Sequence, residues 1–133
     1  MAVRTAKQFL TYVSGAPFQP AVAVGLGLSD EFYATLASGL RAKRDLLCDG
    51  LCAAGFDVFV PQGTYFATVD IRPVGGTDGL EFCRSLPERC GVVAVPSAVF
   101  YENPAVGRHL VRFAFCKRTE VLAEAAARLA DLR

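Results

Sequence analysis

Apolar residues recur at helical spacing through the first third of the chain. This spacing predicts helices over residues 2–14 and 17–26 and a long helix over 30–54. In the long helix, apolar side chains return at three-, four- and seven-residue steps, while charged residues supply much of the opposite side. Gly55 follows at the position where a glycine ends a helix. The apolar positions that carry this pattern in the long helix are Phe32, Leu36, Leu40, Leu47 and Leu51.

Short apolar runs separated by turn residues follow the long helix. Runs at 56–60 and 65–71 predict two strands joined by a loop at 61–64. After them the pattern predicts a helix capped by Thr77, a buried strand, a structureless loop, a last strand and a final helix capped by Thr119. The ranges expected for the helix, strand, loop and last strand are 78–89, 92–95, 96–109 and 110–116.

Strands joined by short turns and interleaved with helices indicate an α+β fold. We expect a small, mostly antiparallel sheet with helices packed on one face. The first two helices look separate from this unit. The predicted division is residues 1–28, the end of a neighbouring domain, and residues 29–133, a small domain that the long helix enters.

The last strand carries a charge on a side that is otherwise small or apolar. Because side chains alternate along a strand, Val111, Phe113 and Phe115 share an apolar side that suits the core. Arg112 projects from the other side, where its guanidinium needs an anion or water. The guanidinium fork matches a carboxylate with two hydrogen bonds. From the pattern alone, a solvent-facing arginine or a structural ion pair remains open.

Two loops are weaker candidates for a site. Gly63-Thr64-Tyr65-Phe66 allows close backbone approach before an aromatic strand, although these residues alone favour an ordinary hairpin turn. Pro96–Tyr101 follows a buried strand with small residues that suit a pocket lining, although a plain surface loop has the same composition. His109 is the only histidine and is expected on a solvent-facing loop. No carboxylate pair, phosphate loop or metal-ligand spacing stands out.

The composition of the chain narrows the classes of partner that it is expected to contact. Fourteen basic and thirteen acidic side chains leave a formal charge of +1, which argues against a nucleic-acid surface. The longest apolar run, residues 21–28, is too short to cross a bilayer. Five cysteines without CxxC spacing predict buried, reduced thiols in a cytoplasmic protein. The apolar fraction of 53% indicates that some apolar surface is covered by another subunit or by further polypeptide.

Five stretches in order together resemble the carboxyl-terminal region of class I/II, fold-type-I pyridoxal-phosphate aminotransferases. The resemblance covers essentially the whole chain and is strongest to the group of N-succinyldiaminopimelate, kynurenine and methionine aminotransferases. The strand containing Arg112 is the most specific of the five. The stretches are Val3-Arg4-Thr5-Ala6-Lys7-Gln8, Pro17-Phe18-Gln19-Pro20-Ala21, Pro61-Gln62-Gly63-Thr64-Tyr65-Phe66, Gly91-Val92-Val93-Ala94-Val95-Pro96-Ser97 and Leu110-Val111-Arg112-Phe113-Ala114-Phe115-Cys116-Lys117.

The resemblance implies roles for particular residues. Arg112 falls on the arginine that binds the substrate α-carboxylate, and Gly63, Thr64 and Tyr65 fall on a segment beside the substrate. Tyr12 and Val13 fall where one subunit reaches the active site of its partner in a homodimer. Residues 1–28 then belong to the large domain, which binds the cofactor and forms the dimer, and residues 29–133 form the small domain that closes over substrate.

The family's Schiff-base lysine is expected before Arg4, outside these residues. None of Lys7, Lys43 and Lys117 matches it, so no catalytic residue is assigned in this chain. Pyridoxal 5'-phosphate is implied as the cofactor of the complete enzyme, held mostly by residues elsewhere. The resemblance implies transfer of an amino group between an amino acid and a 2-oxo acid. The alternative is a non-catalytic, free-standing α+β module that binds carboxylates or mediates dimerisation.

Overall fold

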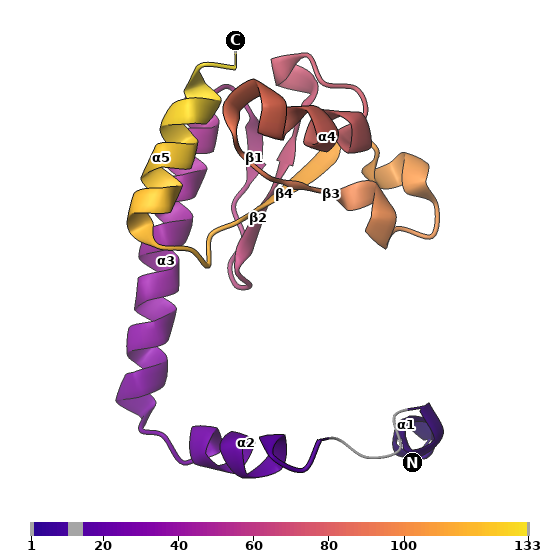
Figure 1. The fold of residues 1–133 in the computed structure, drawn as a ribbon, viewed down its shortest axis with the longest axis vertical. Coiled ribbons are helices and arrows are strands. Elements are labelled where there is room, and N and C mark those ends of the chain that lie inside the picture. Colours follow the sequence, from indigo (N-terminus) through magenta and orange to yellow (C-terminus); the bar gives the residue numbers. More distant parts are fainter. Residues whose placement is uncertain (1, 11–14, 133) are drawn as a thin grey trace. The chain divides into compact units, whose positions relative to one another are not determined.

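The computed structural model describes residues 2–10 and 15–132 (Figure 1). Their contacts divide the chain into two units, residues 1–36 and 37–133. The division falls inside the long helix α3 (Asp30–Ala53), so this helix belongs to both units. Assignment of residues 1–28 to a larger neighbouring domain stays a prediction.

A four-stranded antiparallel sheet forms the centre of the second unit. Its strands are β1 (Asp57–Phe59), β2 (Phe66–Asp70), β3 (Val95–Pro96) and β4 (Leu110–Ala114), in the spatial order β1-β2-β4-β3. β1 and β2 form the expected hairpin, with Val58 opposite Val69. β4 lies in the middle, with Arg112 opposite Thr68 on one side and Val95 on the other. Arg112 is therefore held by strands on both sides.

Helices cover one face of this sheet, as expected from the sequence. α4 (Gly79–Cys90), α5 (Thr119–Ala130) and the second half of α3 pack there, and Figure 1 shows α5 running beside α3. Val111, Phe113 and Phe115 all point into this core, which confirms the alternation predicted for the last strand. The structure thus confirms an α+β fold with a small antiparallel sheet. The helix residues in the core include Leu47, Leu51, Phe82, Leu86, Leu122 and Leu129.

The long helix ends as its sequence predicts. Gly55 has a φ of +94°, a left-handed conformation that glycine adopts without a steric penalty. Its N–H donates to the carbonyl of Cys52, and the N–H of Phe56 donates to the carbonyl of Leu51. These two bonds form a Schellman motif. They turn the chain directly into the first strand and place Phe56 in the core.

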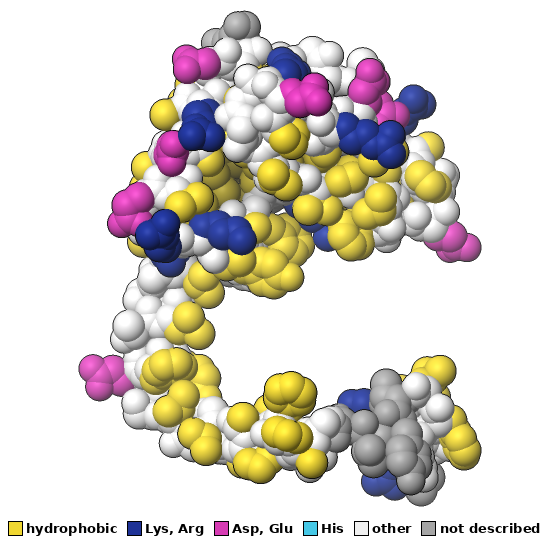
Figure 2. All heavy atoms as spheres, in the orientation of Figure 1, with side chains coloured by type: hydrophobic (Ala, Val, Ile, Leu, Met, Phe, Trp, Pro, Cys, Tyr) yellow, Lys and Arg dark blue, Asp and Glu magenta, His cyan; other side chains and the backbone are white. Residues whose placement is uncertain are grey.

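The first unit contains α1 (Ala2–Leu10), α2 (Phe18–Leu26) and the first turns of α3. Neither α1 nor α2 buries a side chain. The hydroxyl of Tyr33 donates to the carbonyl of Gly25, which links α3 to the end of α2. Figure 2 shows apolar side chains gathered along α2 and the start of α3. The expected extension of the first helix to residue 14 lies outside the described residues.

Several predicted details were wrong. Asp78, not Thr77, caps α4, because its carboxylate accepts from the N–H groups of Leu80 and Glu81. Thr119 is the first residue inside α5, and the preceding Arg118 makes no side-chain cap. Of the strand expected at 92–95, only Val95 lies in a strand, the two-residue β3. The segment expected to be structureless contains two short 3-10 helices, η2 (Ser97–Phe100) and η3 (Pro104–Gly107), and a third, η1 (Arg72–Val74), follows β2.

Candidate functional site

Arg112 lies on the face of the sheet opposite the helices. It shares this face with Thr68, directly across on β2, and with Phe66 and Asp70 on either side of Thr68. Its guanidinium stacks between two rings, with Cζ 4.8 Å from the centroid of Phe66 and 4.1 Å from that of Phe100. The electron-rich faces of both rings stabilise the positive charge without neutralising it.

The Nε of Arg112 has no hydrogen-bond partner within the part of the chain that the structure describes. This atom is buried, and among the described residues no carboxylate forms an ion pair with Arg112. A buried polar group without a partner costs free energy. Arg112 is therefore a candidate for binding an anion from outside the chain, and the fork geometry favours a planar one such as a carboxylate.

The second ring comes from a folded segment rather than a loose loop. Phe100 ends η2, and the N–H of Tyr101 donates to the carbonyl of Ala98. The side chain of Asn103 caps η3 by accepting from the N–H of Ala105. Gly107 is buried against the Tyr101 ring, where a Cβ has no room. These contacts hold the backbone on both sides of Phe100.

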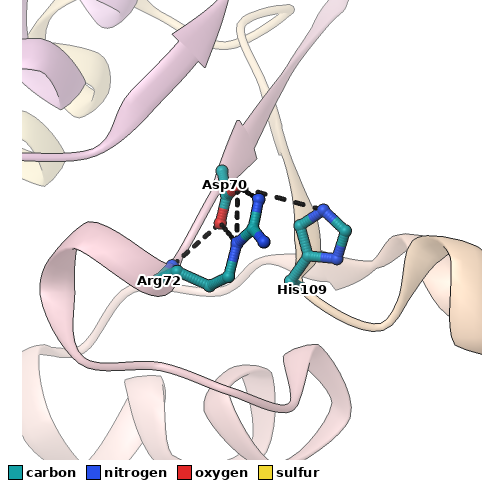
Figure 3. Close-up of polar contacts among 3 residues, drawn as sticks. All are labelled: Asp70, Arg72 and His109. Carbon is teal, nitrogen blue, oxygen red and sulfur yellow. Dashed lines mark hydrogen bonds and ion pairs between the residues drawn. The ribbon is translucent and has the colours of Figure 1, made fainter.

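A second charged cluster lies on the same sheet face, at the other end of β2 (Figure 3). Both oxygens of Asp70 accept hydrogen bonds from the Arg72 guanidinium, at 2.5–3.1 Å, and Oδ1 also accepts from the Arg72 N–H. Nε2 of His109 lies 3.9 Å from Asp70 Oδ2. The hydrogen bonds from Arg72 hold the pKa of Asp70 below its usual value, against the opposing effect of burial.

The other predicted site residues lie in different surroundings. Gly63 and Thr64 line a cavity of about 250 Å³ together with side chains of α3, and Arg112 is not among its lining residues. Thr64, rather than Gly63, has a positive φ of 64°. The Tyr65 ring contacts the Phe66 ring edge-on, with 5.6 Å between the two ring centroids. Tyr65 is therefore next to one of the rings that contact Arg112. Tyr12 and Val13 lie outside the described residues.

Sequence reasoning missed several contacts of this face. Phe66 and Phe100 occur in the two loop segments singled out above, but nothing in the pattern showed that both rings reach Arg112. His109 was expected to face solvent, and this was wrong: its side chain is partly buried and lies beside Asp70. Asp70 pairs with Arg72, two residues later, because a 3-10 helix follows the strand. The sequence pattern alone did not show this pairing.

The five cysteines are free, as expected. Cys48 and Cys83 are buried, and burial raises the pKa of the Cys83 thiol to about 11. Cys52 and Cys116 are exposed, so the expectation of buried thiols was wrong for these two.

Within residues 2–10 and 15–132, no group of three or more His, Cys, Asp or Glu side chains is arranged to hold a metal ion. No helix in the same ranges is both long and apolar enough to cross a membrane.

Comparison with known proteins identifies the family of the chain. The family model "Aminotransferase class I and II" matches residues 2–129. The chain belongs to this family. It is 50% identical to the probable N-succinyldiaminopimelate aminotransferase of Mycobacterium tuberculosis, over 98% of the chain and 35% of that relative. It is 36% identical to the methionine aminotransferase of Escherichia coli, over 98% of the chain and 33% of that relative.

A solved structure shares the fold of this aminotransferase chain. The N-succinyldiaminopimelate aminotransferase structure from Mycobacterium tuberculosis has a TM-score of 0.86 and 52% identity, covering 98% of this chain and 34% of that one. The aminotransferase chain therefore spans about a third of the length of the relatives that it matches.

The described residues of this chain include a candidate for only one part of a pyridoxal-phosphate site. Arg112, whose guanidinium forms no ion pair with the described residues, is a candidate for contact with the carboxylate of a substrate. A covalent link to the cofactor needs a lysine. Lys7 and Lys43 lie on α1 and α3, and Lys117 lines a cavity of about 240 Å³ beside α5. None of these three lysines is assigned a bond to the cofactor.

Proposed function

We propose that this chain is the substrate-carboxylate-binding, carboxyl-terminal part of a pyridoxal-phosphate-dependent aminotransferase. The observation that carries the proposal is the Arg112 guanidinium, which lies over two rings, has a buried Nε without a hydrogen bond and forms no ion pair with any described residue. Family membership over residues 2–129 supports the reaction class, transfer of an amino group between an amino acid and a 2-oxo acid.

Arg112 binds and orients the substrate in this proposal. The carboxylate accepts two parallel hydrogen bonds from the guanidinium, which fixes the rotation of the substrate as well as its position. Amino acids and 2-oxo acids carry the same carboxylate, so one arginine serves both half-reactions. Holding the substrate in one orientation lowers the barrier because less orientational freedom is lost at the reacting bond.

The cofactor supplies the electron sink for the reaction when it is bound. Arg112, Gly63, Thr64 and Tyr65 are the residues of this chain that we assign to the substrate side, and none of them is assigned to the chemical step. In this proposal, the Schiff-base lysine and the phosphate-binding groups belong to polypeptide outside these 133 residues. We further propose that the complete enzyme is a homodimer, with Tyr12 and Val13 reaching toward the partner's site.

The similarity to a probable N-succinyldiaminopimelate aminotransferase suggests the first donor to test. The protein as encoded by its gene is supplied with pyridoxal phosphate and assayed with a panel of donors against 2-oxoglutarate. N-Succinyldiaminopimelate, methionine and kynurenine form the panel. Amino transfer together with visible absorbance from bound cofactor supports the proposal. Carboxylate binding without transfer for every donor points instead to the non-catalytic module.

Substitution of Arg112 tests its role directly. Loss of a charge-assisted, two-bond contact costs about 1.5–3 kcal/mol. Arg112→Ala is therefore expected to raise KM and to lower kcat/KM by about tenfold or more. Arg112→Lys should recover only part of the loss, because an ammonium group lacks the planar fork. Steady-state kinetics on the best donor measures both effects.

Arg108→Ala is the matched control for this experiment. Arg108 has an exposed side chain that pairs with Asp78, so its loss removes one positive charge away from the stacked rings. Equal kinetics for Arg112→Ala and Arg108→Ala refute the assignment of Arg112.

A further inference from the structure

Arg112 has two diagonal neighbours on β2, and they differ in chemistry. The register pairs Arg112 with Thr68, which places Phe66 and Asp70 two residues to either side on the same face. Diagonal neighbours in an antiparallel pair are within reach of long side chains. Of the side chains that β2 puts directly or diagonally beside Arg112, only that of Asp70 carries a negative charge.

The guanidinium lies along the aromatic diagonal. Its Cζ is 4.8 Å from the Phe66 centroid, and no ion pair joins Arg112 to Asp70. This arrangement is unexpected for an isolated arginine, because a carboxylate attracts a cation more strongly than a ring face does. Another contact therefore holds the Asp70 carboxylate away from Arg112.

Arg72 holds that carboxylate. It contacts both oxygens of Asp70 with its side chain and adds a bond from its backbone N–H, so three of its nitrogen atoms point at one group. Asp70 is almost fully buried, with 6% of its side chain exposed, whereas 65% of the Arg72 side chain faces solvent. The buried carboxylate is thus covered from outside by an arginine that is itself mostly in water.

The other charges around Asp70 do not replace this contact. His109 lies 3.9 Å away and makes no hydrogen bond to Asp70. Asp57, opposite Asp70 on β1, is also acidic. Its negative charge raises the energetic cost of an ionised Asp70 that has no cation beside it. Without Arg72, the cation within diagonal reach on the neighbouring strand is Arg112.

We propose that Arg72 is a positioning residue: it occupies Asp70 and so leaves the Arg112 charge free for the substrate carboxylate. This inference rests on the proposed role of Arg112. Removal of Arg72 allows Asp70 to pair with Arg112 as an internal competitor. A substrate then binds only the fraction of molecules in which Arg112 is not paired, which raises the apparent dissociation constant in proportion.

The test uses the protein as encoded by its gene, with 2-oxoglutarate as the probe. Arg72→Ala should raise KM for 2-oxoglutarate by about three- to tenfold with little change in kcat, because the competitor acts on binding alone. Arg108→Ala is the matched control, since 66% of its side chain is exposed and it also pairs with one aspartate. The control should leave KM unchanged.

A second substitution separates competition from structural damage. In Asp70→Asn/Arg72→Ala the competing charge is gone, so KM should return close to that of the unaltered protein. A merely structural role for the pair predicts the opposite, a double variant at least as impaired as the single one. A raised KM in Arg72→Ala that the double variant does not restore overturns the proposal, as does a KM equal to that of Arg108→Ala.

NMR of the Arg112 Nε–H group gives a readout that needs no activity. Stacking on two rings shifts this signal by ring currents, and pairing with Asp70 removes the shift. Arg72→Ala should therefore move the Arg112 signal, and Arg108→Ala should not. An unmoved signal in a folded Arg72→Ala protein overturns the proposal. If instead Arg112→Ala leaves KM unchanged, the proposed function itself fails, and the two failures are distinguishable.

Discussion

At the scale of single residues, the surroundings of Arg112 combine a predictable part and an unpredictable part. The sequence predicts correctly that Arg112 faces away from the core on a strand whose other side is apolar. Its two ring contacts could not be predicted, because they depend on β4 lying beside β2 and on η2 folding back over the strand. Strand order and the placement of a 3-10 turn over a strand depend on tertiary contacts, and the periodicity of a single segment does not show these.

Phe100 provides the closer of the two rings and is therefore the residue-scale prediction. Phe100→Leu keeps an apolar side chain but removes the ring face, and a cation–ring contact contributes about 0.5–2 kcal/mol. We expect a KM for α-carboxylate substrates about two- to thirtyfold higher, because the guanidinium becomes less well oriented. Phe100→Tyr retains a ring and should behave like the unaltered protein.

Steady-state kinetics with one amino donor checks this prediction. Val99→Ala is the control, since Val99 is an exposed neighbour on the same 3-10 helix. An effect of Phe100→Leu no larger than that of Val99→Ala, or one that Phe100→Tyr shares, contradicts a role for the ring.

At the scale of elements, the packing of α3 against α5 depends on one glycine. A Cβ at position 50 would overlap the Cβ of Ala126, so the two helices approach as closely as they do only because Gly50 has no side chain. Gly39 is on the same helix, and a Cβ there would meet no atom within 4 Å, so it carries no such constraint. The two glycines form a matched pair within one element.

Alanine at these two positions should change stability in opposite directions. Gly50→Ala forces α5 away from α3, and such overpacking costs about 1–3 kcal/mol. Gly39→Ala should raise the free energy of unfolding by about 0.5–1 kcal/mol, because alanine loses less backbone entropy in a helix than glycine does. Denaturant unfolding of each variant measures both changes. Equal effects at the two positions contradict the close contact between α3 and α5.

The elements show where sequence reasoning succeeds and where it fails. The ends of α3 and the β1–β2 hairpin agree with the sequence pattern to within a few residues, because a Schellman glycine and a short turn are local signals. The predicted strand at 92–95 begins too early, since its apolar run extends beyond the backbone pairing of β3 with β4. The cap of α4 is misplaced by one residue, because Thr77 and Asp78 are both good caps and only geometry selects Asp78.

At the scale of the whole molecule, the apolar surface is unevenly distributed. The core lies within residues 37–133, whereas α1 and α2 bury no side chain. Phe9, Phe18 and Leu26 are all largely exposed. Short helices of this kind are marginally stable in water without packing. We infer that another surface covers the first unit, consistent with a chain that spans about a third of its relatives.

Hydrogen exchange tests whether such a surface exists. In the 133-residue chain alone, backbone amides of α2 should exchange rapidly, and those of β2 and β4 slowly, because local stability follows burial. In the protein as encoded by its gene, further polypeptide that covers Phe18 and Leu26 should slow exchange in α2 while leaving β4 unchanged. Rapid exchange in α2 there as well means that nothing covers the first unit, which contradicts its assignment to the end of a large domain. The β4 amides serve as the internal control, since the core that protects them lies wholly within residues 37–133.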